Sequence, residues 1–153
     1  MNNVNILCLE KSMYQYNPKR KKWTELCKQM TQDRIGAACL TFGNKGLIFG
    51  GFLNGKCSNT IDVMRLTLRC HLTVRSTGAT LPLPLMFHTV TKISNYEFIL
   101  CGGLNSKGMP VSDVYYGASY WFSGVSNPGT WEIYWVKQQY LFRSCSLKSF
   151  TVR

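Results

Sequence analysis

The stretch Leu47-Ile48-Phe49-Gly50-Gly51 decides the fold, because it occurs again as Phe98-Ile99-Leu100-Cys101-Gly102-Gly103. In both copies an apolar run typical of a buried strand leads into two glycines, and the second diglycine lies 52 residues after the first. Glycine adopts positive φ angles without steric cost, so a diglycine suits a tight turn at the end of a strand. The repetition indicates two copies of one structural unit.

Two further motifs recur at nearly the same displacement. Residues 35–40 correspond to residues 86–91, and Thr60-Ile61-Asp62-Val63 corresponds to Val111-Ser112-Asp113-Val114, each shifted by 51 positions. Three landmarks in the same order at the same spacing define an internal repeat of about 50 residues.

The whole sequence predicts short strands rather than helices. Apolar residues do not recur at the spacing of an amphipathic helix, and turn-forming residues interrupt the β-prone runs about every 8–12 positions. We therefore expect an all-β sandwich, barrel or propeller, with no helix longer than about three turns. The expected strands are residues 4–9, 13–17, 22–26, 35–42, 46–50, 60–66, 69–75, 86–93, 97–101, 112–118 and 131–136.

A period near 50 residues with four strands per unit is typical of kelch repeats, and the chain resembles that family over residues 10–136. The resemblance implies an all-β, kelch-type β-propeller fragment with two four-stranded blades and partial blades at both ends. Its implied boundaries are 1–33 for the second half of a partial blade, 34–84 and 85–136 for two repeats, and 137–153 for the truncated start of another blade. The residues that match the family pattern are Gly50, Gly51, Gly102, Gly103, Asp62, Asp113, Trp23 and Trp131.

The resemblance also implies roles for these residues. The tryptophans would pack one blade against the next, and each aspartate would accept backbone hydrogen bonds in the loop before the third strand. The match is imperfect, because Leu85 replaces the arginine that opens a kelch blade, as Arg34 does in the first repeat. An aromatic, glycine-rich detour over residues 119–130 is expected before Trp131.

Residues 85–94, followed by the second diglycine and by Ser112-Asp113, are similar to the kelch region of the leucine carboxyl methyltransferase-like tRNA wybutosine-synthesising proteins. This similarity implies a non-catalytic binding or scaffold module in tRNA modification. The alternatives are a generic kelch adaptor, which holds a protein partner through loops on one propeller face, and a truncated product with little function of its own.

No catalytic, cofactor-binding or metal site is predicted. Neither diglycine is followed by the Lys-Ser/Thr of a phosphate loop, and the carboxylates are too dispersed to form a catalytic pair. His71 has no ligand partner at metal spacing. His88 falls on an innermost strand, where we expect a structural histidine with a hydrogen-bond partner.

The net charge of the chain indicates what kind of partner it binds rather than what reaction it catalyses. The chain has 18 Lys+Arg against 7 Asp+Glu, a formal net charge of +11. The densest point, Lys19-Arg20-Lys21-Lys22, occupies the turn between two expected strands. It is either a solvated hairpin tip, a nuclear-localisation-like cluster, or a contact for RNA phosphates, such as those of tRNA, beside Tyr16 and Trp23.

The sequence also predicts a compartment and an association state. The seven cysteines include no Cys-x-x-Cys pair, and neither a signal peptide nor a membrane-spanning run is evident. We therefore expect reduced thiols in a cytoplasmic or nuclear protein. An incomplete propeller leaves strand edges and apolar faces unpaired, so the isolated chain is expected to bind the rest of its propeller or to self-associate.

Overall fold

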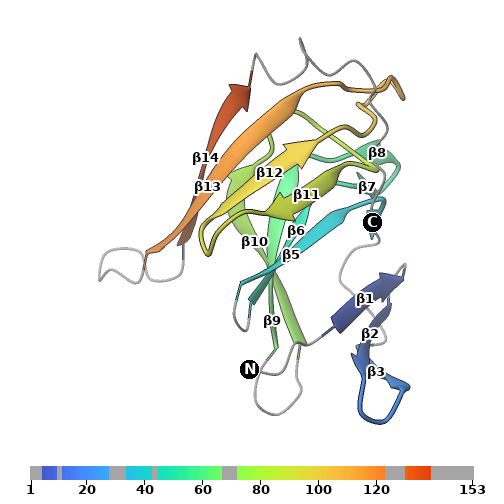
Figure 1. The fold of residues 1–153 in the computed structure, drawn as a ribbon. Coiled ribbons are helices and arrows are strands. Elements are labelled where there is room, and N and C mark those ends of the chain that lie inside the picture. The colour runs from blue at the N-terminus through green and yellow to red at the C-terminus, as the bar shows by residue number, and fades with distance from the viewer. Residues whose placement is uncertain are drawn as a thin grey trace, which may run out of the picture.

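The computed structural model describes residues 5–9, 12–27, 34–42, 45–66, 72–122 and 130–138, and the regular structure in these ranges is entirely β (Figure 1). Two four-stranded antiparallel sheets form the main body. This confirms the predicted all-β fold with four-stranded sheets, which is consistent with kelch blades.

The first four-stranded sheet contains the first copy of the repeat. Its order is β10-β9-β6-β5, so the apolar strand before the diglycine lies at an inner position of the sheet. A small sheet of order β4-β7-β8 lies beside it. The strands are β4 (Arg34–Ile35), β5 (Ala38–Phe42), β6 (Lys45–Phe49), β7 (Phe52–Leu53), β8 (Lys56–Cys57), β9 (Thr60–Leu66) and β10 (Leu72–Thr80).

The second four-stranded sheet contains the second copy and has the order β11-β12-β13-β14. Its strands are β11 (Thr89–Lys92), β12 (Glu97–Cys101), β13 (Val114–Phe122) and β14 (Thr130–Gln138). Each sheet therefore places its strands in chain order from one edge to the other, apart from the short strands β7 and β8, which lie in the loop between β6 and β9.

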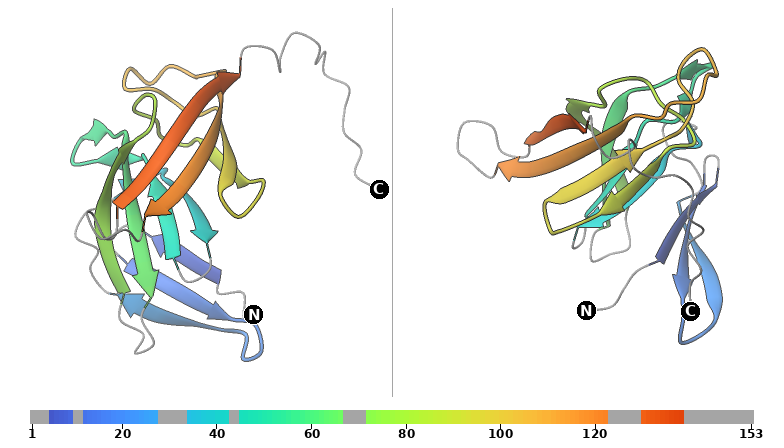
Figure 2. Two further views of the ribbon diagram at one scale, coloured as in Figure 1. Left: turned by 90° about the vertical axis from the view of Figure 1, so that its left-hand side faces the viewer. Right: turned by 45° about the horizontal axis from the view of Figure 1, so that its top comes forward.

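A fourth sheet, at the N-terminus, has the order β1-β2-β3, with β1 (Asn5–Leu9), β2 (Ser12–Asn17) and β3 (Lys22–Cys27). Figure 2 shows it apart from the two larger sheets. It carries one strand more than the half blade implied for residues 1–33. The truncated blade expected over residues 137–153 lies almost wholly outside the described residues.

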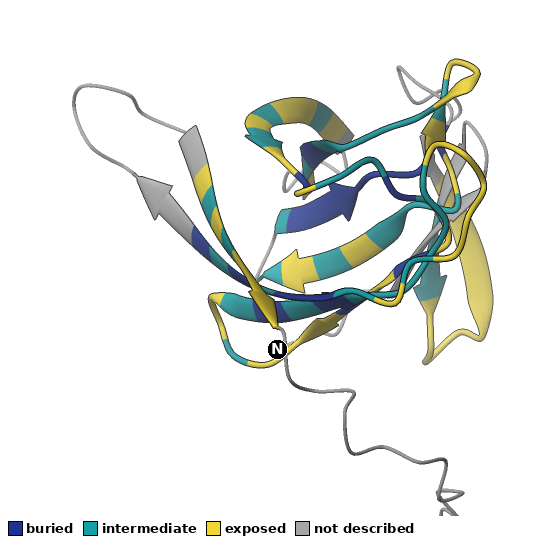
Figure 3. Ribbon diagram, turned by 90° about the horizontal axis from the view of Figure 1, so that it is seen from above, coloured by how far each residue is buried: buried dark blue, intermediate teal, exposed yellow. Residues whose placement is uncertain are grey.

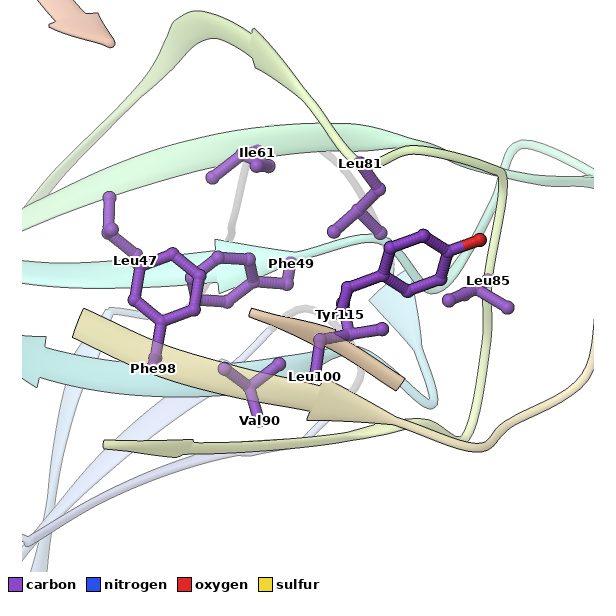
Figure 4. Close-up of a cluster of buried hydrophobic side chains, with 9 residues drawn as sticks. All are labelled: Leu47, Phe49, Ile61, Leu81, Leu85, Val90, Phe98, Leu100 and Tyr115. Atoms are coloured by element: carbon purple, nitrogen blue, oxygen red, sulfur yellow. The ribbon is translucent and has the colours of Figure 1, made fainter. Parts of the chain in front are cut away.

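The two larger sheets pack face to face, with β5 next to β11 and β10 next to β14. Phe49 of the first sheet meets Phe98 of the second with ring centroids 5.3 Å apart. Buried residues are concentrated on the strand faces where the two sheets meet, whereas the loops are mostly intermediate or exposed (Figure 3). Buried hydrophobic side chains form one core cluster, which is drawn in Figure 4. It consists of Leu47, Phe49, Ile61, Leu81, Leu85, Val90, Phe98, Leu100 and Tyr115.

Several strand boundaries differ from prediction, some of them for local reasons. Gly36, with φ of +65°, separates β4 from β5, which were expected as one strand. Strand β10 continues to Thr80 through a bulge at Gly78, where the hydroxyl of Thr77 donates to the carbonyl of Ile61 at 2.6 Å. The predicted start of this strand at residues 69–71 lies outside the described residues.

Strand β13 is also longer than predicted. The detour expected from Ser119 starts after Phe122, because the backbone N–H of Ser119 donates to the carbonyl of Tyr96 at 2.7 Å and its side chain is buried. The remaining part of the detour, residues 123–129, lies outside the described residues.

Candidate interaction surface

Four loops gather at one end of the two large sheets. They are residues 34–37, 50–59, 81–88 and 102–113, and we call them the loop end. The antiparallel order places them together, because each precedes the first strand of a sheet or joins its second strand to its third. Figure 1 shows β7 and β8 at this end, near the end of β12.

Backbone hydrogen bonds tie the loops of the two repeats to each other. Leu85 accepts from the N–H of Gly51 at 2.8 Å and donates to the carbonyl of Ser58 at 3.2 Å. Phe87 donates to the carbonyl of Gly36 at 2.7 Å. The loop end is therefore one continuous backbone platform rather than a set of separate loops.

Both diglycines have left-handed backbone conformations. The φ angles of Gly50 and Gly51 are 55° and 92°, and those of Gly102 and Gly103 are 69° and 90°. A Cβ on Gly50 would lie 2.6 Å from the carbonyl oxygen of Leu85 in the next repeat. A Cβ on Gly102 would meet nothing within 4 Å. Gly50 must therefore be glycine both because of its positive φ and because a side chain would clash with the next repeat. Gly102 must be glycine because of its positive φ alone.

Asp62 forms a buried ion pair with Arg34, 2.6 Å from Asp62 Oδ2 to Arg34 Nη2. The guanidinium also donates to the carbonyl of Gly50 and to the hydroxyl of Thr60, both at 2.8 Å. The backbone hydrogen bonds expected for this aspartate are replaced by a charged side chain. The planar, multi-donor guanidinium explains this, since it reaches carboxylate, hydroxyl and carbonyl together.

Asp113 has different partners, although it is the repeat counterpart of Asp62. It accepts from Lys137 Nζ at 2.8 Å and from the hydroxyl of Tyr115 at 3.1 Å. The hydrogen bond from Lys137 lowers the pKa of Asp113, with a smaller contribution from Tyr115. Leu85, at the position of Arg34, is fully buried in the apolar core and cannot supply a charge.

His88 lies between the two diglycines. A Cβ on Gly50 would be 3.0 Å from its Cε1, and a Cβ on Gly103 would be 2.8 Å from its Cβ. The side chain is buried, and neither ring nitrogen has a hydrogen-bond partner among the described residues. Burial lowers the pKa of His88 to about 4, so the imidazole is neutral at pH 7. The described residues do not supply the hydrogen-bond partner that was expected for this structural histidine.

The loop end exposes large apolar side chains. Phe87 and Met109 are each 58% exposed, and Ile35 and Phe52, which face each other across β4 and β7, are also exposed. Phe87 has a φ of 56°, which is rare for an aromatic residue, and a Cβ on Gly36 would clash with its ring. Sequence reasoning missed these residues, because Ile35 and Phe87 fell within expected strands, where an apolar residue indicates burial, and an isolated apolar residue such as Met109 forms no periodic pattern.

The tryptophan between the two sheets is Trp135, which the sequence analysis did not single out. Its Nε1 donates to the carbonyl of Thr80 at 2.9 Å, and its ring meets Phe98 edge to face at 5.3 Å. A groove of about 670 Å³ adjoins it, between residues 78–82 and 132–135. Trp131 pairs with Trp121 in the backbone register, and its side chain lies outside the described residues.

Trp23, the other predicted packing residue, lies on the N-terminal hairpin. Its ring is 52% exposed and contacts Tyr16, with centroids 5.0 Å apart. Lys19, Arg20, Lys21 and Lys22 follow β2 at the exposed turn, where Asn17 Oδ1 accepts from the N–H groups of Lys19 and Arg20, both at 3.1 Å. The structure therefore places the basic tetrad beside an aromatic pair and away from the loop end.

The described part of the chain contains no group of three or more His, Cys, Asp or Glu side chains that could hold a metal ion. Within the same ranges, no helix is long and apolar enough to cross a membrane.

Known proteins offer a partial match. No protein-family model matches the chain. It is 33% identical over 85 residues to Kelch domain-containing protein 1 of Homo sapiens and 32% identical over 82 residues to Kelch domain-containing protein 1 of Mus musculus. Each match covers 54% of this chain and 20% of the relative, so the chain spans about a fifth of the length of these relatives.

These relatives support the kelch part of the sequence interpretation and give no support to a link with wybutosine synthesis. Repeat spacing, four-stranded antiparallel sheets and relatives agree with one another. The chain therefore shows distant and partial similarity to Kelch domain-containing protein 1, and its four-stranded sheets are consistent with kelch blades.

Proposed function

We propose that this chain is a non-catalytic kelch binding module that holds a protein partner through its loop end. The observation that carries the proposal is the exposure of Phe87, Met109, Ile35 and Phe52 on loops from both repeats. Exposed apolar side chains that gather on one surface are typical of protein interaction sites. Aromatic and methionine side chains are also enriched at such interfaces.

The platform supports binding because its backbone is already fixed. Hydrogen bonds from Phe87 to Gly36 and from Met86 to Leu104, at 2.7 and 3.0 Å, hold the loop that carries Phe87. The loop that carries Met109 is closed by Asn105, whose side-chain oxygen accepts from the N–H of Met109 at 3.1 Å. A preorganised surface loses little conformational entropy on association.

Substitution at Phe87 and Met109 tests the proposal in the full-length protein. Phe87→Asn keeps a residue that tolerates positive φ, and Met109→Ser removes the second apolar contact. Tyr96→Ser is the matched control, because Tyr96 is 64% exposed on the hairpin at the opposite end of the sheet. Cross-linked partners of parent and variants would be compared by quantitative mass spectrometry, with thermal unfolding as the check on folding.

The proposal expects a set of partners that is lost from the Phe87→Asn/Met109→Ser variant and retained by Tyr96→Ser. Equal recovery from all three proteins, or equal loss from both variants, would overturn it.

A role as a binding or scaffold module in tRNA modification is a second proposal. It rests on the resemblance of residues 85–94 to the wybutosine-synthesising proteins and on the net charge of +11. In that reading too, the chain would assist an enzyme rather than transfer methyl groups itself. Calorimetric titration with S-adenosylmethionine should therefore give no binding heat, and micromolar affinity would contradict a non-catalytic role.

A further inference from the structure

We propose that the β2–β3 hairpin binds single-stranded nucleic acid, with phosphates on its basic turn and an unpaired base on the Trp23 ring. The site lies on a different sheet from the loop end and does not depend on the proposed protein partner. It joins two observations from the same hairpin, a cluster of exposed cations and an aromatic pair whose tryptophan is exposed.

The four cations are exposed, and none of them forms an ion pair with another described residue. The turn that carries them has a defined shape, because Asn17 Oδ1 accepts the N–H groups of Lys19 and Arg20 and Lys21 has a φ of 50°. Glu25, the acidic residue described on this hairpin, pairs with Tyr14 further from the turn. The tip therefore presents concentrated positive charge without a nearby carboxylate among the described residues.

The aromatic pair lies one register position from the basic turn. Tyr16 faces Trp23 across the hairpin, and Asn17 faces Lys22 at the next position. The rings are tilted by 44°, and 52% of Trp23 remains exposed. The contact given for the Trp23 ring among the described residues is with Tyr16, which leaves about half of the residue accessible to a base.

This combination favours an unpaired nucleic-acid strand over other polyanions. A cationic surface attracts duplexes and acidic peptides through charge alone. An exposed aromatic ring adds affinity when a base is free to stack on it, which requires a single strand. The hairpin contacts do not distinguish ribose from deoxyribose, so the shared chemistry is phosphate and an unpaired base.

Fluorescence anisotropy with the full chain tests the site, with oligo(U), oligo(dT), a duplex RNA and poly-glutamate as probes. Lys19→Gln/Arg20→Gln is compared with Arg65→Gln/Arg75→Gln, which removes two exposed cations from β9 and β10. Both variants reduce the net charge equally. Trp23→Ala is compared with Trp23→Phe, which retains an aromatic ring, and circular dichroism reports whether each variant keeps its β structure.

Four phosphate contacts predict a log–log salt slope of about −3 for a single strand, and the hairpin variant should reduce its magnitude by about 1.4. The matched control should leave the slope unchanged. Trp23→Ala should weaken oligo(U) and oligo(dT) binding by roughly 5- to 150-fold, whereas Trp23→Phe should retain most of the affinity. Single strands should bind more tightly than duplex RNA or poly-glutamate.

Three outcomes would overturn the proposal. Equal effects of the two double variants would attribute binding to net charge. Equal affinity for single strands and for poly-glutamate or duplex RNA would remove the role of the unpaired base. A Trp23→Ala variant that folds and binds as the parent does would remove the stacking contact.

Discussion

Lowering the pH from 7 to 5 should weaken the packing of the two large sheets through the imidazole of His88. This side chain is 6% exposed, lies between the two diglycines and has no hydrogen-bond partner among the described residues. Burial lowers its pKa from 6.5 to about 4. Below about pH 6.5 the unfolded chain therefore binds a proton that the folded chain does not, and stability falls as the pH falls.

The magnitude follows from the difference between the two pKa values. A shift of one unit corresponds to about 1.4 kcal/mol, so protonation of the unfolded state removes about 2 kcal/mol between pH 7 and pH 5. The loss continues to about pH 4, where the folded state also takes up the proton, and reaches about 3 kcal/mol in total. A loss of this size is a large fraction of the stability of a typical domain.

Denaturant unfolding of parent and His88→Leu at pH 7 and pH 5 measures this effect. Every other titrating group, including His71, is present in both proteins and cancels in the difference between their pH dependences. The variant should lose about 2 kcal/mol less than the parent between the two pH values. Its stability at pH 7 should be close to that of the parent, because leucine removes the buried polar atoms. Equal pH dependence in the two proteins would refute the reasoning.

Three further predictions concern charge, packing and association. Arg34→Leu should cost about 3–5 kcal/mol of unfolding free energy, because it leaves the carboxylate of Asp62 buried and unpaired; Arg34→Leu/Asp62→Leu should recover much of this loss in the same denaturant titration. Trp135→Phe should cost about 1 kcal/mol by removing the hydrogen bond to Thr80, measured by thermal unfolding, and an unchanged Tm would contradict that contact. Strand β14 is a sheet edge that exposes Tyr134 and Val136, so the isolated chain should self-associate; a monomer in light scattering would oppose this.

The sequence was sufficient to predict the strands that the repeat defines. The apolar run before each diglycine corresponds to β6 and β12, because a strand whose residues are buried or half-buried on both faces reads as a continuous apolar segment. The predicted strand boundaries were wrong where a glycine could either end a strand or form a bulge within it. Gly78 looks like the end of a strand in sequence, yet it forms a bulge inside β10, and the hydrogen bonds that decide between these outcomes come from β9.

The candidate interaction surface was less predictable than the fold. Ile35 and Phe87 fell within expected strands, where an apolar residue indicates burial, but both are exposed at the loop end, Ile35 on the short strand β4 and Phe87 in the loop before β11. Their exposure depends on Gly36, whose positive φ and close contact with the Phe87 ring redirect the chain before β5. A contact between residues 51 positions apart leaves no local pattern in the sequence.

The two repeats share a backbone plan but differ in charge, and this difference bears on how the loop end can adapt to a partner. Arg34 connects three groups of the first repeat from a buried position, so movement there would expose or separate a buried ion pair. In the second repeat, Asp113 and Lys137 meet where both side chains are partly exposed, and such pairs contribute little to stability. A partner could therefore separate Asp113 from Lys137 at small cost, and we expect the second repeat to supply the adjustable part of the surface.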